Sequence, residues 1–295
     1  MSRVYEAVQR ADRERNAAEE AEGRHLAETM IVPCVGTPQL VNVDVDLGRI
    51  ARHLWKPSGA SLPALGNRGA GIEQFRGLRS RIDQLRMEAP LKTILVSSGM
   101  PAEGKTFVAA NLALSLARNA VNNILLIDGD LRRGTLHNLL GAPNAPGLAE
   151  YLAGAADLTA IMQQCATTEK ANAGAASSIS RVTFIPSGVY NDGSSELVAS
   201  HRMENLVAIL SPHFDWIVID SPPVLAVTDA VELARAADAV LLVARGANTS
   251  FEVAQRAQSA FCTSRILGFV LNAVKDVSRN KSYSYYYGRE EGGQR

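Results

Sequence analysis

Eight consecutive residues of this chain have the types and spacing needed to bind phosphate groups. Residues 99–106 read Gly-Met-Pro-Ala-Glu-Gly-Lys-Thr and fit the pattern G-x-x-x-x-G-K-[ST]. In such a loop the glycines let backbone N–H groups point at the phosphates, and the start of the following helix adds a positive dipole end. Lys105 can then reach the outer phosphates, and the Thr106 hydroxyl can bind Mg²⁺. The segment therefore predicts a site for a nucleoside triphosphate.

Two further segments place carboxylates at the ends of apolar runs. Residues 124–127 lead into Asp-Gly-Asp-Leu-Arg at 128–132, and residues 216–219 lead into Asp220. Near-continuous apolar runs are typical of strands that are buried on both faces of a parallel sheet, and ligands bind at the carboxyl ends of such strands. A single Asp of this kind would fit an ordinary surface turn. Two such strands in a chain with a phosphate-binding loop favour one shared nucleotide site.

The elements that must position these groups alternate between apolar strands and amphipathic helices. The predicted strands are 93–97, 123–127, 182–185, 216–220, 239–244 and 266–272. The first of them precedes the loop, and an Ala/Leu-rich helix over 108–117 follows it, which is the setting that a phosphate-binding loop requires. The sequence therefore predicts an α/β fold, a P-loop NTPase three-layer sandwich with a mostly parallel central sheet.

Composition changes on both sides of this region. Residues 1–30 are rich in Glu, Arg and Ala, and 31–70 contain several Pro and Gly, so residues 1–70 are expected to be an N-terminal extension and linker. The P-loop domain then spans 71–273, and 274–295 form a flexible tail. Inside the domain, the small residues of 165–180 predict a surface insertion.

Charge and cysteine content exclude several classes of partner. Thirty basic residues balance thirty acidic ones, so no nucleic acid and no anionic membrane is expected to bind through overall charge. The three cysteines are isolated, which predicts neither a disulfide framework nor a zinc site and fits a reducing cytoplasm. No apolar stretch is long enough to span a membrane, and no signal-peptide pattern is present. We therefore expect a soluble, cytoplasmic chain.

The tail concentrates aromatic hydroxyl groups. Four of the seven tyrosines fall within five positions, as Tyr283, Tyr285, Tyr286 and Tyr287. The segment has no apolar periodicity and cannot form a core of its own. Two interpretations are open: an incidental aromatic tail, or a row of acceptors for phosphoryl transfer.

Two other features flank the site in sequence. Apolar side chains recur at helical spacing over 72–85, and Glu73, Arg76 and Arg79 follow at i, i+3 and i+6 on another side of that helix. Ordinary solvated charges would give the same pattern, so its position just before the loop is what singles it out. Asn272 ends the last predicted strand, where its amide could read a purine base or could simply end the strand.

In combination, these motifs resemble the cytoplasmic module of the bacterial tyrosine kinases (BY-kinases) that govern capsule and exopolysaccharide synthesis. The resemblance covers about residues 70–288. The Walker A loop, the Walker A′ motif at 128–132 and the Walker B Asp220 are shared with the deviant Walker class of ParA/MinD-like ATPases. The E-x-x-R-x-x-R helix at 73–79 and the tyrosine cluster, taken together, are specific to the kinases.

Two positions depart from the family pattern. The family usually has Gly where this chain has Ala102, and Pro where Gly134 follows Arg133. Since Ala restricts one loop torsion relative to Gly, the departure bears on the fine geometry of the loop and leaves phosphate binding in place.

The resemblance implies a non-specific protein-tyrosine autokinase that uses ATP and Mg²⁺. Its catalytic residues would be Lys105, Asp128, Asp130 and Asp220, with Asp128 accepting the tyrosine proton. The metal would be held by Thr106, Asp130 and Asp220. The nucleotide-binding residues would be Gly99, Met100, Pro101, Ala102, Glu103, Gly104, Lys105, Thr106, Phe107 and Asn272.

The resemblance also implies how such a kinase is organised. The tail tyrosines would be phosphorylated in trans, and Glu73, Arg76 and Arg79 would join subunits into a ring when the tail is dephosphorylated. The implied partners are a transmembrane polysaccharide co-polymerase, or chain-length regulator, with an activating cytoplasmic tail, and a phosphotyrosine phosphatase. The chain would lie at the inner face of the plasma membrane through the first partner and regulate polysaccharide synthesis and export.

Two other functions remain open. A ParA/MinD-like positioning ATPase would carry a second signature lysine early in the loop, where this chain has Met100. A nucleotide-gated scaffold would bind the nucleotide without transferring phosphate. The missing lysine and the tyrosine cluster favour the kinase.

Overall fold

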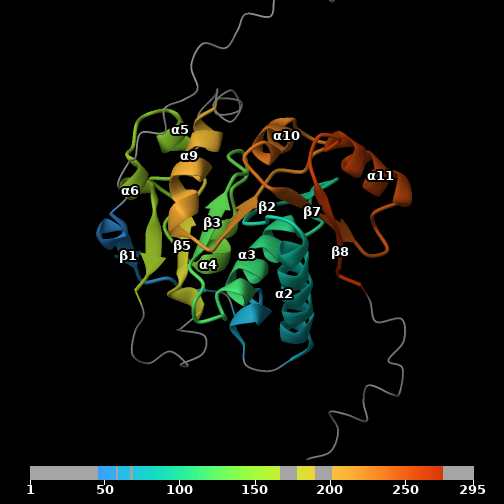
Figure 1. Ribbon diagram of the computed structural model, residues 1–295, viewed down its shortest axis with the longest axis horizontal. Helices are drawn as coiled ribbons and strands as arrows, with labels where there is room; N and C mark the ends of the chain where they lie inside the picture. Colours follow the sequence, from blue (N-terminus) through green and yellow to red (C-terminus); the bar gives the residue numbers. More distant parts are fainter. Residues whose placement is uncertain (1–45, 58, 67–68, 167–177, 190–200, 275–295) are drawn as a thin grey trace, which may run out of the picture. The chain divides into compact units, whose positions relative to one another are not determined.

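The computed structural model describes residues 46–57, 59–66, 69–166, 178–189 and 201–274. They form an eight-stranded sheet in the order β1-β4-β5-β3-β6-β2-β7-β8, with helices on both faces (Figure 1). Neighbouring strands run parallel, except that β4 pairs antiparallel with β5. The strands are β1 (Ala51–His53), β2 (Thr93–Ser98), β3 (Ile124–Asp128), β4 (Gln163–Cys165), β5 (Val182–Ile185), β6 (Trp216–Asp220), β7 (Ala239–Arg245) and β8 (Ile266–Asn272). The expected α/β fold with a mostly parallel sheet is confirmed.

The six strands predicted from apolar runs are all present, each within one residue of its expected ends. Every residue of β2, β3, β5 and β6 is buried. These strands lie inside the sheet and are covered on both faces, which is why their sequences are apolar throughout. β8 lies at one edge of the sheet, and its residues are only partly buried or exposed.

Alternate residues of each central strand enter two separate cores. On one face Ile94, Val96 and Leu126 pack with the helices α2 and α3. On the other face Leu95 and Ile127 pack with α5, α9, α10 and α11. The helices are α2 (Ala70–Glu88), α3 (Lys105–Leu116), α4 (Leu136–Leu140), α5 (Leu148–Leu152), α6 (Leu158–Ile161), α9 (Arg202–Leu210), α10 (Asp229–Ala234) and α11 (Phe251–Ala260), with 3-10 turns η1 (Leu47–Arg49), η2 (Pro63–Leu65) and η3 (Ser211–His213).

Part of the expected linker belongs to this fold. Strand β1 extends the sheet by pairing with β4, and Trp55, Leu62 and Ala64 are buried in the core on the α2 side. The expectation of a linker is therefore wrong for the described residues from 46 onward. Both β1 and β4 are three residues long and lack an apolar run, so the sequence pattern gives no sign of them.

The expected insertion is also shorter than its composition suggested. Cys165 closes β4, and Ser178 and Ile179 are buried, so both ends of 165–180 belong to the folded domain. The middle of that segment lies outside the described residues. Among the residues that the structure describes, no helix combines the length and apolar character needed to cross a membrane.

Candidate nucleotide site

The phosphate-binding loop lies between a buried strand and a buried helix, as its sequence pattern requires. β2 ends at Ser98 and α3 begins at Lys105. Gly104, just before the helix, has a φ of 95°, in the left-handed region that glycine adopts readily. A side chain at this position would also collide with the Asn272 amide at the end of β8. Glycine is thus required here both for the turn and for the contact between the loop and β8.

A cavity of about 650 Å³ opens beside this loop. Its walls come from the loops that follow β2, β3 and β6, which is the carboxyl edge where ligands of parallel sheets bind. The lining residues are Pro101, Ala102, Gly104, Lys105, Thr106, Asp130, Arg132, Arg133, Thr135, Pro222, Pro223, Ala226 and Val227. The volume is within the usual range for small-molecule sites.

The loop accommodates Ala102 with support from the turn after β7. Ala102 has a φ of 63°, a conformation that costs a non-glycine residue roughly 1–2 kcal/mol. Its carbonyl accepts a hydrogen bond from Arg245 Nη1 at 3.1 Å. The neighbouring Glu103 is buried, and its carboxylate accepts from Met100 N at 2.8 Å and from the Thr249 hydroxyl. Glu103 therefore braces the loop from inside instead of lining the cavity.

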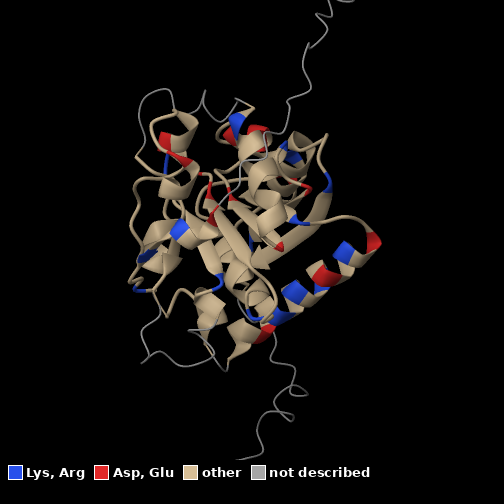
Figure 2. Cartoon of the chain, turned by 60° about the vertical axis from the view of Figure 1, so that its left-hand side comes forward, with Lys and Arg blue, Asp and Glu red and all other residues tan. Residues whose placement is uncertain are grey.

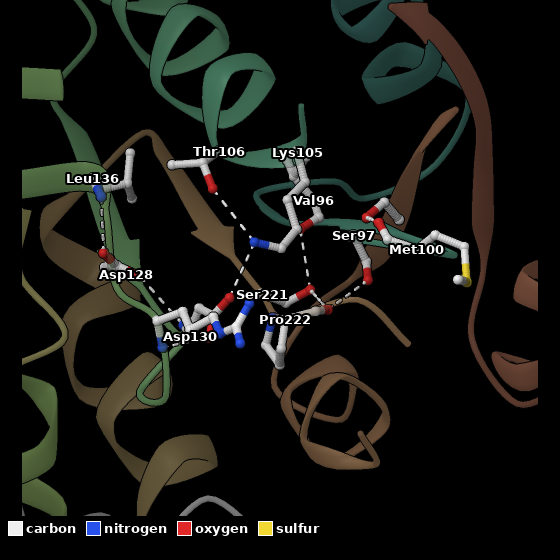
Figure 3. A network of polar contacts seen from close by, with 12 residues as sticks. Val96, Ser97, Met100, Lys105, Thr106, Asp128, Asp130, Leu136, Ser221 and Pro222 are labelled. Carbon is white, nitrogen blue, oxygen red and sulfur yellow. Dashed lines mark hydrogen bonds and ion pairs between the residues drawn. The ribbon is translucent and has the colours of Figure 1, made fainter. Parts of the chain in front are cut away.

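Lys105 is held by an acidic partner at the floor of the site (Figure 3). Its Nζ donates to Asp130 Oδ2 at 3.0 Å and lies 3.4 Å from Thr106 Oγ1. Burial alone would lower the pKa of Lys105, but the charges of Asp220 and Asp130 outweigh burial and raise the pKa above its ordinary value. Lys105 therefore stays positively charged, as binding to phosphate requires.

Asp128 is buried at the end of β3. Its Oδ2 accepts from Leu136 N at 3.1 Å and its Oδ1 from Asp130 N at 3.3 Å. Burial raises the pKa of Asp128 well above its usual range, and the nearby charge of Asp220 raises it further. The two carboxyl residues are direct partners in the β3–β6 pairing, which places them side by side. A raised pKa makes the deprotonated carboxylate a stronger base.

Asp220 is buried, and neither carboxylate oxygen has a partner with normal hydrogen-bond geometry among the described residues, although the Thr106 hydroxyl and the Ser221 amide lie close enough to act on it. Burial raises its pKa to about 6, although Lys105 and the Thr106 hydroxyl act in the opposite direction. A buried carboxylate with two oxygens left over is costly unless a ligand satisfies it. Mg²⁺ fits this arrangement, because it binds one or two carboxylates and completes its shell with waters and phosphate oxygens.

The structure brings together most of the residues that the sequence assigned to the site. Among the catalytic and metal candidates, Lys105, Thr106 and Asp130 line the cavity, and Asp128 and Asp220 are buried behind it. Gly99 and Met100 belong to the loop but do not line the cavity. The roles of all these residues stay predictions.

Besides Glu103, two further predicted nucleotide contacts are engaged elsewhere. The ring of Phe107 packs against that of Phe75, with centroids 5.7 Å apart, toward α2. Asn272 Nδ2 donates to the carbonyl of Glu103 at 3.0 Å, and its Oδ1 accepts from Ala273 N at 2.9 Å. The Asn272 side chain therefore contacts the backbone of the loop in this structure.

Several cavity residues were not assigned from the sequence. Arg132 and Arg133 lie within and just after the Walker A′ motif, and Pro222 and Pro223 directly follow Asp220. Their proximity to the motifs in the sequence could have identified them as site residues. Ala226 and Val227 carry no chemical signal in the sequence and enter the site only through the fold.

The E-x-x-R-x-x-R residues lie on α2, along which acidic and basic residues are interspersed (Figure 2). Arg76 pairs with Glu73 at 2.9 Å within the helix. Arg79 is partly buried, and its Nη1 donates to Ser115 O near the end of α3 at 2.8 Å. Tyr283, Tyr285, Tyr286 and Tyr287 lie outside the described residues.

Comparisons with known proteins agree with this site. The family model described as an AAA domain matches residues 91–256. Tyrosine-protein kinase YwqD of Bacillus subtilis is 32% identical over 216 residues, which cover 72% of this chain and 85% of the relative. The chain belongs to the family of bacterial tyrosine kinases. Tyrosine-protein kinase wzc of Salmonella typhimurium is 33% identical over 231 residues, 77% of this chain.

Solved structures place the fold in the same family. The kinase domain of Escherichia coli tyrosine kinase ETK has a TM-score of 0.67 at 28% identity, covering 83% of this chain and 90% of that domain. The chimerical protein CapA2B2 has a TM-score of 0.64 at 27% identity, covering 77% and 95%. The cell-division ATPase MinD of Pyrococcus furiosus is less similar, with a TM-score of 0.50 at 25% identity over 61% of this chain and 71% of MinD. This BY-kinase family member spans only about 30% of the length of Salmonella wzc.

Proposed function

We propose that this chain transfers the γ-phosphoryl group of Mg-ATP to protein tyrosines, and to its own tail tyrosines in trans. One observation carries the proposal. A single cavity brings together the phosphate-binding loop, Lys105 and Asp130, with Asp128 and Asp220 directly behind them, in a chain whose relatives are named tyrosine-protein kinases. The structure supports nucleotide binding by geometry, and the relatives support tyrosine as the acceptor.

In the proposed reaction the bond between the γ-phosphorus and its bridging oxygen breaks, and ADP keeps the electron pair. A new bond forms from the tyrosine oxygen to the phosphorus, and the phenolic proton passes to Asp128. The raised pKa of Asp128 suits this step, because tyrosine is a weak acid that gains from a base of matched strength. Lys105 holds the outer phosphates and stabilises the charge that shifts toward ADP.

The metal in this proposal is Mg²⁺. Thr106, Asp130 and Asp220 are the residues that would hold it, directly or through its waters, and the bound ion would neutralise negative charge on the phosphates. The unsatisfied oxygens of Asp220 are the observation that fits such an ion. The pairing of Lys105 with Asp130 implies that nucleotide and metal binding rearrange this contact.

Incubation of the purified chain with Mg-ATP, followed by detection of phosphotyrosine, tests the proposal. We expect phosphotyrosine that depends on Mg²⁺ and maps to Tyr283, Tyr285, Tyr286 and Tyr287. Lys105→Met should reduce it by about a hundredfold or more, because Lys105 is the loop's cation for the transferred charge. A variant with all four tail tyrosines changed to Phe separates autophosphorylation from phosphorylation of added tyrosine peptides.

Measuring ATP hydrolysis and nucleotide binding on the same samples separates the alternatives. ATP hydrolysis without phosphotyrosine would favour a positioning ATPase, whose fold the MinD structure shares. Nucleotide binding with neither reaction would favour a scaffold. The positioning ATPases carry their second lysine at the loop position where this chain has the half-exposed Met100. This difference argues against a positioning ATPase.

The cellular role is part of the proposal. We infer that the kinase regulates capsule or exopolysaccharide synthesis and export at the inner face of the plasma membrane. Its partners would be a transmembrane chain-length regulator with an activating cytoplasmic tail and a phosphotyrosine phosphatase. Support comes from the relatives named as tyrosine kinases and from the similarity to the chimerical CapA2B2. Stimulation of weak basal activity by the regulator's tail peptide tests this role.

A further inference from the structure

An ion pair joins two of the loops that border the cavity. Arg132, in the loop after β3, donates from Nε to Asp229 Oδ2 at the start of α10, at 3.2 Å. The side chain of Asp229 is 6% exposed, whereas that of Arg132 is 41% exposed. The carboxylate is therefore anchored inside the protein, and its partner Arg132 is one of the residues that line the cavity.

The sheet explains why these residues meet. β3 and β6 are neighbours, so the loops at their carboxyl ends lie side by side, although Arg132 and Asp229 are 97 positions apart. A pair exposed on both sides would contribute little. Here one partner is buried, and a buried carboxylate that lost its cation would be strongly unfavourable. The pair therefore restricts where the guanidinium of Arg132 can lie.

The position of Arg132 matters because of what shares the cavity with it. Lys105 and Thr106, the residues expected to contact the outer phosphates, line the same cavity. Phosphoryl transfer spreads negative charge over the transferred group and the leaving oxygen, and an arginine there stabilises that charge. A guanidinium is suited to this because it is planar, always charged and able to make two parallel hydrogen bonds.

We propose that Asp229 is a positioning residue that holds the guanidinium of Arg132 in the cavity, and that Arg132 stabilises the phosphoryl group during its transfer. The inference rests on the proposed function for the reaction itself, in which the γ-phosphoryl group leaves ADP for tyrosine or water. Arg132 and Asp229 exchange no proton in that reaction. Their contribution is to the charge distribution of the transition state.

A purely structural role for Asp229 makes different predictions. Asp229 is the first residue of α10, where a carboxylate stabilises the helix dipole whether or not Arg132 is present. Loss of that effect would lower the stability of the protein and would weaken the binding of all ligands alike. Loss of Arg132 positioning would weaken only the binding of ligands that mimic the phosphoryl group in transfer, and would slow the transfer itself.

The experiment compares Asp229→Asn, Arg132→Lys, the double variant and Asp229→Glu with the unmodified full chain. Glu232→Gln is the matched control, because Glu232 pairs with Arg235 at 2.9 Å on the same helix but does not line the cavity. Calorimetry gives the affinity for Mg-ADP alone and for Mg-ADP with aluminium fluoride, which mimics a phosphoryl group in transfer. Single-turnover assays give the rates of transfer to tyrosine and to water.

We expect Asp229→Asn and Arg132→Lys to keep their affinity for Mg-ADP within about twofold. Both should lose about ten- to a hundredfold in transfer rate and in aluminium fluoride affinity. The double variant should lose no more than Arg132→Lys alone, because the two residues act as a unit. Asp229→Glu should recover part of the loss, and Glu232→Gln should match the unmodified chain.

Three results would overturn the inference. The first is an equal loss of affinity for Mg-ADP with and without aluminium fluoride. The second is a double variant whose loss of transfer rate equals the product of the two single losses, and the third is an unchanged transfer rate in Arg132→Lys. Arg132→Lys keeps the test decisive if Asp229→Asn unfolds. Failure of the kinase proposal is recognised separately. In that case the unmodified chain forms no phosphotyrosine, while aluminium fluoride affinity and transfer to water still report on Arg132 and Asp229.

Discussion

At the scale of single residues, Gly134 shows how packing accounts for a departure from the BY-kinase pattern. A methyl group at this position would overlap Ser187, and it would lie 3.1 Å from Asp128 Oδ2. Ser187 is itself buried, and its hydroxyl donates to Asn144 Oδ1 at 3.2 Å. The space that a proline ring would need at position 134 is thus filled by a side chain from the loop after β5.

Gly134→Ala should therefore damage the site through overpacking. We expect a loss of about 1–3 kcal/mol in the free energy of unfolding, measured by urea denaturation, and a lower transfer rate because Asp128 lies next to the added methyl group. Ser187→Gly removes the colliding atoms, so Gly134→Ala/Ser187→Gly should recover more rate than Gly134→Ala alone. A double variant that is worse than both single variants would contradict this explanation.

The buried carboxylate of Asp220 lowers the stability of the protein when it is charged, and its proposed role in metal binding explains why the residue is present. Its folded-state pKa of about 6 lies above the unfolded value near 4. The contribution of this carboxyl to stability is therefore complete below about pH 4 and is lost as the pH rises through about 6. Above that range the metal-free protein must hold a buried charge whose oxygens have no partner with normal hydrogen-bond geometry among the described residues.

Asp220→Asn should thus stabilise the metal-free protein while it abolishes transfer. At pH 8 in EDTA we expect the variant to exceed the unmodified chain by about 1–3 kcal/mol in the free energy of unfolding, and the difference should shrink toward pH 4. Urea unfolding at both pH values measures it. A variant that is less stable at pH 8 would show that Asp220 is better satisfied than its surroundings indicate.

At the scale of elements, the phosphate-binding loop depends on neighbours far away in the sequence. The turn after β7 supplies Arg245 and Thr249, which contact Ala102 and Glu103 across about half of the chain's length. Thr249 Oγ1 also accepts from Arg245 N at 2.8 Å, so the two contacts are linked. The loop therefore keeps Ala102 in a left-handed conformation through tertiary contacts and without the glycine usual at that position.

Thr249→Val tests this support with little change in side-chain size. Losing a hydrogen bond to the Glu103 carboxylate should loosen the loop and weaken the binding of Mg-ADP by about tenfold, as measured by calorimetry. Ala102→Gly in the same background should recover part of the affinity, because glycine adopts the conformation without strain. Thr263→Val, at an exposed threonine in the turn after α11, is the matched control and should bind as the unmodified chain does.

At the scale of the whole molecule, α2 is the surface through which we expect subunits to meet. Burial lowers the pKa of Arg118, and the charges of Arg76 and Arg79 lower it further, as expected where basic groups cluster. Such a cluster favours an acidic surface on a neighbour, in agreement with the proposed ring. Arg79 also supports the end of α3, so Arg76 is the better position for a test.

Sizing chromatography of the full chain tests the ring. The dephosphorylated chain should elute as an assembly, and Arg76→Ala should elute as a smaller species at the same concentration. Arg81→Ala on the same helix is the control and should assemble normally. The side chain of Arg81 donates a hydrogen bond to its helix neighbour Gln84. Normal assembly of Arg76→Ala would leave the helix as an ordinary surface.

Phosphorylation is expected to reverse assembly. Each phosphate adds roughly −1.5 to −2 charges, and four of them would fall within five positions of the tail. Asp128 and Asp220 are buried and the cavity is lined by Arg132 and Arg133, so the repulsion would come mainly from the phosphates themselves. An elution volume unchanged by phosphorylation would contradict this.

The sequence by itself determined the strands of the central sheet and the positions of the motifs. β2, β3, β5 and β6 are buried on both faces, so their apolar runs appear directly in the sequence. The Walker loop and the aspartates follow those strands at once, and parallel strands carry whatever follows them to one edge of the sheet. Local pattern and this general rule were sufficient to place Lys105, Asp128, Asp130 and Asp220 near one another.

Only the tertiary structure decided which distant residues complete the site. Arg132 and Asp229 are 97 positions apart, and Glu103 and Thr249 are 146 apart. Neither pair has a spacing or periodicity that a single sequence reveals, because each contact depends on the order of strands in the sheet. The same holds for β1 and β4, whose three-residue strands are held by pairing with neighbours and not by an apolar pattern of their own.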